Sequence, residues 1–277
     1  MKNMTRRQAI GAAMGATVGG ALGVLIPTKL TSAAQAAPVE VKKSETPVKI
    51  EWKPVKLDAA KVAPEAYKLY AEGNCMYASF TSLCRALAEA SEKTNPSMSK
   101  VLKEFPCEMM KYGHSGTGNQ GSLCGALNGC SAIFGLLVRD KKKVDSMIAE
   151  LFGYYETTEM PIFKPEPENP KFEPMAQSVA NSVLCHVSQM NWCKESGESP
   201  FSEFRSDRCK RLTADCVTKA IEILNRYVES EGKAIFKTSN TQQKACMDCH
   251  GENGAIGNVS ARMDCTTCHD MVDHYEE

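Results

Sequence analysis

The chain has 277 residues, with 33 basic and 33 acidic side chains and 13 cysteines. This charge balance excludes the class of strongly basic proteins that bind the phosphates of nucleic acid. We therefore expect no nucleic-acid partner. The length suffices for one hydrophobic core with an appended segment.

Residues 1–36 have the features of a twin-arginine export signal. Arg6 and Arg7 precede a Gly- and Ala-rich apolar stretch, and Ala34-Gln-Ala36 is typical of a cleavage site. Five glycines interrupt the apolar stretch, and no other segment is apolar enough to cross a bilayer. We therefore expect a periplasmic protein with no membrane span in the mature chain; retention of the signal as an anchor is the alternative. Cleavage leaves 29 basic against 33 acidic residues, a mildly acidic chain.

The mature chain is predicted to be all-α, with a helical, Cys-rich domain at 64–235 and a small, loop-rich segment at 236–277. Residues 37–63 are rich in Pro and Lys without periodicity, which predicts an extended N-terminal arm. Apolar residues at three- and four-residue spacing predict helices at 64–92, 97–111 (interrupted at Pro106), 121–138, 144–155, 175–192 and 213–231. Pro64 suits a first helical turn. The five prolines within 156–174 predict a long surface excursion.

The segment 236–277 contains two CxxCH motifs. They consist of Cys246, Cys249 and His250, and of Cys265, Cys268 and His269. Two thiols at this spacing bond to one porphyrin through thioethers, and the histidine that follows binds the iron. The segment is therefore predicted to bind two c-type haems. A structural zinc site made of the four cysteines is the alternative, but it leaves both histidines without a role.

A segment of about 42 residues is too small to enclose two haems by itself, since chains of that size rarely form an adequate core. We therefore expect the haems to pack against the helical domain or against a second subunit.

Each haem iron needs a second axial ligand to be a low-spin electron carrier, and the candidates are His114, His186 and His274. His274 follows His269 by five residues, about 140° around a helix, so it faces away from its own haem. His114 lies in a glycine-rich loop that can approach a porphyrin. His186 has a second interpretation as a core histidine, and methionine ligation is a further alternative. Bis-histidine ligation favours low reduction potentials.

Several motifs of the helical domain resemble a known family. Asn74-Cys75, Gly121-Ser-Leu-Cys-Gly-Ala126, Cys209-Lys-Arg-Leu212 and Cys216-Val217 are similar to the ordered motifs of the C_GCAxxC family of redox-active helical proteins. The chain departs from that pattern at Cys130, which lies six residues after Cys124. With two CxxCH motifs appended, nearly all of the mature chain resembles the split-Soret cytochrome c family of periplasmic dihaem proteins. The resemblance implies a homodimer, bis-histidine haems and an iron–sulfur site in the helical domain.

Nine cysteines lie outside the CxxCH motifs, an odd number that cannot pair fully within one chain. Four thiolates are the usual ligands of an iron–sulfur cluster, and the first choice is Cys75, Cys124, Cys209 and Cys216. On one straight helix Cys209 and Cys216 are about 10 Å apart, so their convergence requires a bend, which Thr213 as an N-cap offers. Cys216 then lies near a helix N-terminus, where thiolate is favoured.

Disulfides and inert buried thiols are the alternatives to a cluster. Cys84, Cys107, Cys185 and Cys193 are expected to be packing residues that can replace a member of the four. The twin-arginine route carries folded proteins, and c-type haem is attached only after export. The export signal therefore favours a cluster that is inserted in the cytoplasm.

These observations predict a periplasmic dihaem cytochrome that transfers electrons to and from other periplasmic redox proteins, an electron carrier rather than an enzyme. An acidic surface suits partners with a positive patch. Two other functions stay open. A haem-dependent reductase requires an iron with an open coordination site. A thiol–disulfide module coupled to haem requires reactive cysteines in the helical domain.

Overall fold

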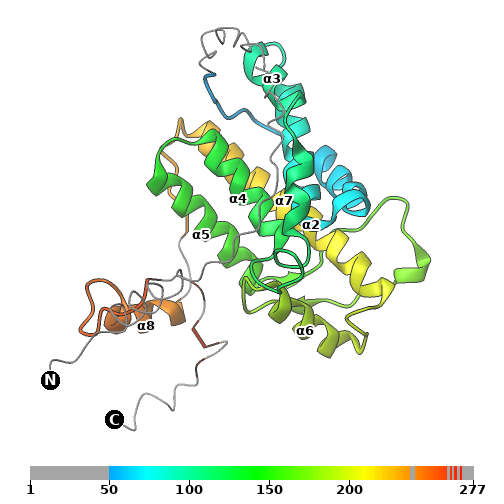
Figure 1. The fold of residues 1–277 in the computed structure, drawn as a ribbon, viewed down its shortest axis with the longest axis vertical. Coiled ribbons are helices and arrows are strands. Elements are labelled where there is room, and N and C mark those ends of the chain that lie inside the picture. The colour runs from blue at the N-terminus through cyan, green and yellow to red at the C-terminus, as the bar shows by residue number, and fades with distance from the viewer. Residues whose placement is uncertain (1–49, 238–240, 261–262, 264, 267–268, 270–277) are drawn as a thin grey trace, which may run out of the picture. The chain divides into compact units, whose positions relative to one another are not determined.

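The structure is a computed structural model that describes residues 50–237, 241–260, 263, 265, 266 and 269. The predicted export signal and residues 37–49 of the predicted arm lie outside the described residues. The elements are α2 (Ala59–Ser91), α3 (Pro96–Lys103), the 3-10 helix η1 (Cys107–Gly113), α4 (Gly125–Leu137), α5 (Lys141–Thr157), β1 (Glu159–Met160), the 3-10 helix η2 (Pro170–Phe172), β2 (Ser178–Val179), α6 (Cys185–Ser196), α7 (Glu203–Glu229) and α8 (Thr241–His250) (Figure 1). The described part is mostly helical, in agreement with the all-α prediction.

The long helix α2 is the centre of the helical body. It packs against α7, α4, α3 and η1, so segments from most of the domain meet along it (Figure 1). Leu69, Phe80 and Leu83 are almost completely buried along α2. Each such side chain stabilises the fold by about 1.5–3 kcal/mol relative to exposure in water.

The start of α2 differs from the prediction, because the helix begins at Ala59. Asp58 is its N-cap, and the Asp58 carboxylate accepts a hydrogen bond of 3.0 Å from the Ala60 amide. Pro64 lies inside the helix and not in its first turn. Asp at this place is a common N-cap residue, and this signal outweighs the preference of proline for a first turn.

Residues 50–58 precede α2 without regular secondary structure, but they are not a free arm. Leu57 is buried. The side-chain amide of Asn225 on α7 accepts a hydrogen bond from the Leu57 amide at 2.9 Å and donates one to the Leu57 carbonyl at 2.8 Å. Both backbone polar groups are satisfied at the edge of the core, which holds this end of the arm on the helical body.

A kink divides α2 directly before Cys75. Gly73 and Asn74 have non-helical backbone angles, and Asn74 has φ 65° and ψ −168°. Few residues other than glycine adopt this conformation, which costs about 1–3 kcal/mol and is found mostly at functional sites. Because helical geometry resumes after Asn74, Cys75 is the first residue of a new helical segment.

The helix predicted at 175–192 begins ten residues later, at Cys185. Ser178 and Val179 form β2, which pairs antiparallel with β1. Asn181 has a positive φ of 56°, and Leu184 forms an isolated bridge with Leu123. Tertiary pairing therefore overrides the apolar spacing of this segment.

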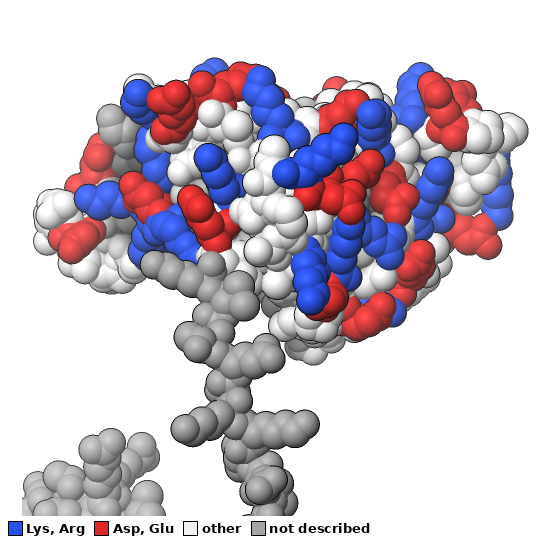
Figure 2. Space-filling view, turned by 90° about the horizontal axis from the view of Figure 1, so that it is seen from above, with Lys and Arg blue, Asp and Glu red and all other residues white. Residues whose placement is uncertain are grey.

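The charged side chains on the face shown in Figure 2 are mixed, with acidic and basic groups interspersed over the helical body. The helical body also carries surface ion pairs, among them Arg85 with Glu65 and Lys141 with Asp145. No helix among the described residues has the length and apolar character of a bilayer span.

Glu150 on α5 joins three segments, and Glu150→Gln is expected to lower the free energy of unfolding by about 1–3 kcal/mol at neutral pH. Its carboxylate pairs with Arg226, with Lys219 at 3.3 Å, and with the Lys237 amide at 2.9 Å. Burial opposes its ionisation, but these partners lower the pKa of Glu150 below its ordinary range. A lowered folded-state pKa stabilises above the unfolded-state pKa and is lost as pH falls through the folded-state value. Urea titrations of the two proteins are therefore expected to differ at pH 7 and to converge in acid; an equal difference at all pH values would contradict this role.

Candidate metal and haem sites

Three cysteines of the helical body stand at the beginning of helical segments. Cys75 follows the kink in α2, Cys124 is the N-cap of α4, and Cys185 is the first residue of α6. Two hydrogen bonds tie the last two together: the Cys124 amide donates to Val183 O at 2.9 Å, and the Cys185 amide donates to Ser122 O at 2.7 Å. The positive ends of these helices favour thiolate over thiol.

Two glycines allow α4 to approach α2 at this point. A Cβ atom on Gly125 would lie 2.6 Å from the Cys75 Sγ, and one on Gly129 would lie 2.1 Å from the Ser79 Oγ. Gly125 and Gly129 are four residues apart, so both lie on the α4 face that meets α2. The sequence pattern Gly-x-x-x-Gly is a signal for this close approach that the sequence analysis overlooked.

The helix α7 adds Cys209 to the three thiols. It is continuous from Glu203 to Glu229, and the Thr213 hydroxyl donates to Cys209 O at 2.8 Å inside the helix. The predicted bend at Thr213 is therefore wrong. Cys209 and Cys216 remain about 10 Å apart along the helix axis. Cys185, expected to be a packing residue, lies among Cys75, Cys124 and Cys209, whereas Cys216 lies near Cys124 and Cys130.

One of the four thiols is acidic. A hydrogen bond from the Cys75 thiol, assisted by the Tyr155 hydroxyl and the Ala126 amide, lowers the pKa of Cys124 to about 6 against the effect of burial. The same hydrogen bond, together with burial, raises the pKa of Cys75 well above its ordinary range. Burial and the nearby Cys124 raise the pKa of Cys185 to about 12. Without metal, one negative charge therefore suppresses ionisation of the neighbouring thiols.

A buried cation faces these thiols. Arg208 on α7 is 1 % exposed, and its Nη2 donates to the Ser188 Oγ at 2.8 Å. Its Nη1 lies 3.9 Å from the Cys209 Sγ, and its Nε has no hydrogen-bond partner. In the described part of the chain no carboxylate forms an ion pair with Arg208. A buried, unpaired guanidinium is costly, and thiolates or a thiolate-bound metal centre supply the negative charge that it lacks.

No group of three or more His, Cys, Asp or Glu side chains among the described residues has the arrangement of a formed metal site. The four thiols nevertheless fit an iron centre in donor type and number. Gln189 also donates to the Cys185 Sγ at 3.0 Å, as a partner that orients a ligand would. Metal binding deprotonates cysteine ligands, so the neutral thiols are compatible with a site that closes when iron enters.

The first CxxCH motif lies at the end of α8, a helix of 10 residues within the segment predicted to be loop-rich. Cys246, Cys249 and His250 follow one another on its last turns. The His250 Nδ1 is 2.9 Å from the Asn258 Oδ1. If Nδ1 donates to this oxygen, the ring is in the tautomer whose Nε2 carries a lone pair, which is the form of imidazole that binds iron. Asn258 is a functional candidate that the motif itself could not reveal.

The second CxxCH motif is described only in part. The His269 amide donates to Cys265 O at 3.0 Å, which is the spacing of one helical turn. Cys268 lies outside the described residues, as does His274, so neither of these predictions is tested. The turn between Cys265 and His269 is compatible with the local geometry that the motif requires.

Two of the predicted distal histidines lie at the surface of the helical body. His186 is exposed on α6, so its alternative interpretation as a core histidine is wrong. His114 is half-buried in the loop after η1. Gly121, at the end of that loop, packs against His186: a Cβ atom on Gly121 would lie 2.9 Å from the His186 Cβ. Either imidazole can therefore serve only a haem that docks on this surface.

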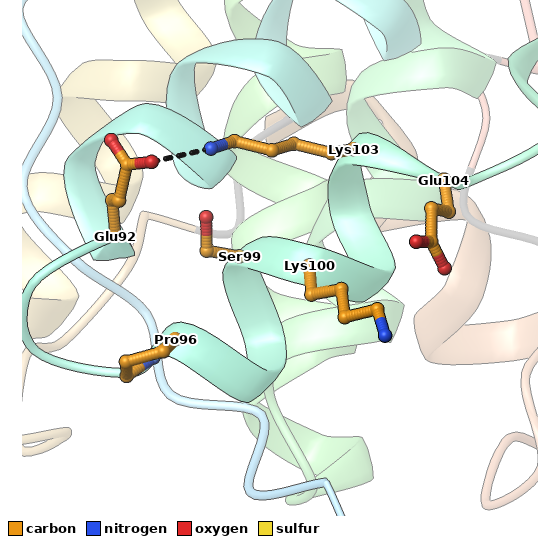
Figure 3. Close-up of a pocket in the computed structure, with 6 residues that line it drawn as sticks. All are labelled: Glu92, Pro96, Ser99, Lys100, Lys103 and Glu104. Atoms are coloured by element: carbon orange, nitrogen blue, oxygen red, sulfur yellow. Dashed lines mark hydrogen bonds and ion pairs between the residues drawn. The ribbon is translucent and has the colours of Figure 1, made fainter.

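A hollow of about 300 Å³ beside α3 lies away from these groups (Figure 3). It is lined by Glu92, Pro96, Ser99, Lys100, Lys103 and Glu104. Glu92 and Lys103 pair across it at 2.6 Å. It has neither a thiol nor an imidazole in its lining, so it offers no ligand of the kind that the motifs require.

The comparisons with known proteins agree on a redox family. Residues 74–223 match the family described as "Putative redox-active protein (C_GCAxxG_C_C)". The chain is 34% identical over 274 residues to the split-Soret cytochrome c of Desulfovibrio desulfuricans, covering 96% of this chain and 95% of that protein. It is also similar to the structure "A novel iron centre in the split-Soret cytochrome c" from the same organism, with a TM-score of 0.69, 31% identity, and coverage of 82% of this chain and 93% of that chain.

The family signature corrects one expectation. It has glycine, not cysteine, at the end of its short motif, and Ala126 and Gly129 occupy its AxxG positions. Cys130 is therefore not required by the pattern. The chain departs from the signature at Cys124 and Gly125, which stand in the reverse order.

Proposed function

The chain belongs to the split-Soret cytochrome c family and to the C_GCAxxG_C_C redox family, and from this premise we propose that it is a periplasmic electron carrier with two c-type haems and a thiolate-bound iron centre. The related structure is described as having a novel iron centre, and in this chain four cysteines lie near one another beside a buried arginine. That constellation is the observation that carries the proposal. The chain's charge balance and the two CxxCH motifs are compatible with it.

In this proposal the C-terminal segment binds both haems. Cys246 and Cys249 would form the thioether bonds of the first haem and Cys265 and Cys268 those of the second, and His250 and His269 would bind the irons. Bound haem supplies one-electron chemistry. Asn258 holds the His250 ring in one orientation and one tautomer, which strengthens the imidazole as a ligand.

We assign Cys75, Cys124, Cys185 and Cys209 as the ligands of an iron–sulfur cluster. Cys185 replaces Cys216 in the set expected from the sequence, because α7 is straight and separates Cys216 from Cys209. Arg208 balances the negative charge of the thiolates, and burial of three of the four sulfurs limits access of water and oxidants. A buried site with its counter-charge already in place suits an electron carrier, because the surrounding protein rearranges little when the charge of the site changes.

The second histidine for each haem iron would come from His114, His186 or His274. His186 is exposed and His114 is half-buried on the helical body, which suits a haem presented by a second copy of the chain. A homodimer therefore accounts for both the distal ligands and the covering of the haems. The twin-arginine signal accounts for the export of a domain that folds around its cluster before it crosses the membrane.

Metal and acid-labile sulfide analysis of anaerobically purified protein tests the proposal. We expect more iron than haem, with sulfide, and low-spin spectra that carbon monoxide leaves unchanged. Iron equal to haem with no sulfide would contradict the cluster and leave a dihaem carrier, with Cys75 and Cys124 as a candidate dithiol. A high-spin ferric spectrum with rapid carbon monoxide binding would favour the haem-dependent reductase.

The variant Asn258→Leu is expected to raise the reduction potential of one haem and leave the other unchanged. Loss of the hydrogen bond to the His250 Nδ1 weakens the imidazole as a donor and destabilises the ferric state. A hydrogen bond of about 0.5–1.5 kcal/mol corresponds to roughly 20–60 mV for a one-electron couple. A spectroelectrochemical titration measures both potentials, and an unchanged pair in Asn258→Leu would contradict this role.

A further inference from the structure

A pocket of about 460 Å³ opens between α2, α3 and η1, and it contains a second thiol pair. Thr81, Arg85 and Ala88 form one wall, and Leu102, Phe105 and Cys107 form part of the other. Cys84 lies on the same face of α2, between Thr81 and Ala88, and is completely buried. Its Sγ is within hydrogen-bond reach of both Leu102 O, at 3.4 Å, and the Cys107 sulfur.

The two thiols differ in access and in acidity. Cys107, expected to be a packing residue, is partly exposed in the pocket, whereas Cys84 lies beneath it. The hydrogen bond from Cys84, together with the Thr81 hydroxyl and Arg85, lowers the pKa of Cys107 to about 7 against the effect of burial. The same contact raises the pKa of Cys84 far above its ordinary range. An accessible thiolate with a protonated thiol directly behind it is the arrangement of an attacking and a resolving cysteine.

Thr81 is a second feature of this site. The residue is 1 % exposed and lines the pocket, and its hydroxyl has no hydrogen-bond partner other than the Cys107 sulfur, whose pKa it lowers. A buried hydroxyl without a partner is costly unless a group in the pocket satisfies it. A thiolate on Cys107 is such a group.

We propose that Cys84 and Cys107 are a redox-active dithiol that reacts with low-molecular-weight disulfides in this pocket, separately from the haem and iron sites. The Cys107 thiolate attacks one sulfur of the disulfide, forms a mixed disulfide and releases the first thiolate. Cys84 then loses its proton and attacks the Cys107 sulfur, which forms the Cys84–Cys107 disulfide and releases the second thiolate. The dithiol is oxidised by two electrons, the small disulfide is reduced to two thiols, and the two protons pass to the products.

Other charged and titratable groups also face the pocket. Tyr77 and Glu89 lie on α2, Lys103 on α3, and Glu108 on η1. Glu108 opposes the lowering of the Cys107 pKa, and Lys103 is held by its ion pair with Glu92 (Figure 3).

Peptide mapping of the ferric, haem-loaded full chain after exposure to oxidised glutathione tests the proposal. The unmodified protein is expected to form the Cys84–Cys107 disulfide, and Cys84→Ala to stop at a glutathione adduct on Cys107. Cys193→Ala, which removes a buried thiol outside both sites, is the control and is expected to form the same disulfide. A disulfide that joins Cys107 to a different cysteine, or the absence of both the disulfide and the adduct, would overturn the proposal.

A pH profile provides a readout that a packing role would not change, and it remains informative if Cys84→Ala does not fold. Alkylation of Cys107 by iodoacetamide is expected to reach half its maximal rate near pH 7. Thr81→Val keeps the shape of the side chain but removes the hydroxyl, so the midpoint is expected to move to higher pH. An unchanged midpoint in Thr81→Val, or an ordinary thiol midpoint in the unmodified protein, would overturn the proposal.

Discussion

Cys185→Ala is expected to remove the iron that is not haem, whereas Cys216→Ala is expected to retain it. Cys185 lies among the other three proposed ligands, at the N-terminus of α6 and next to Gln189. A cluster that loses one of four thiolates is bound much more weakly or not at all. Iron and acid-labile sulfide, each measured relative to haem, are the readouts.

The Cys216→Ala variant is a matched control, because Cys216 is also a buried cysteine of the helical body. Both variants are expected to keep two haems and unchanged haem spectra, since the CxxCH motifs are untouched. If Cys216→Ala lost the iron and Cys185→Ala kept it, the set Cys75, Cys124, Cys209 and Cys216 would be correct. Loss in both variants would mean that the iron centre depends on the packing of the whole cysteine group.

Gly129→Ala is expected to lower the free energy of unfolding by about 1–3 kcal/mol, the usual cost of an extra methyl group in a close-packed interface. The new Cβ would lie 2.1 Å from the Ser79 Oγ and 2.7 Å from Met76 O. The Met76 carbonyl belongs to the backbone of α2 and cannot move aside as a flexible side chain can. The helix α4 must therefore move away from α2. Chemical denaturation of the ferric protein measures the change.

Gly135→Ala on the same helix is the matched control. Gly135 is exposed and has open space where a Cβ would stand. Alanine is favoured over glycine in an exposed helix, so this variant is expected to gain about 0.5–1 kcal/mol. Equal effects of the two substitutions would contradict the close approach of α2 and α4 that brings Cys75 to Cys124.

The predicted haem ligands are close together in the sequence, whereas the proposed ligands of the iron–sulfur cluster are far apart in it. Two thiols and an imidazole within five residues hold one haem wherever the segment lies, because covalent spacing sets their distances. Apolar periodicity likewise predicted most helices, including the long α2, from neighbouring residues. Asp58 is likewise a local signal, because an Asp side chain at this position caps the start of α2.

The four cysteines proposed as cluster ligands come from segments that are far apart in the chain. Cys185 joins Cys124 because the strand-like bridge at Leu123 and Leu184 aligns two helix starts, and no spacing in the sequence encodes that pairing. From the sequence alone, Arg208 would be expected at the surface, as most arginines are. The packing of α7 instead buries it beside Cys209. The Cys84–Cys107 pair likewise arises from the packing of η1 on α2.

By itself the sequence predicted the haem ligands, the helical class and the families that the chain resembles, since each depends on residues close together in the chain. Only the tertiary structure decided which cysteines meet, which of them is acidic and which cation faces them. These properties depend on burial and on distances across the core, which are set when separate helices pack together.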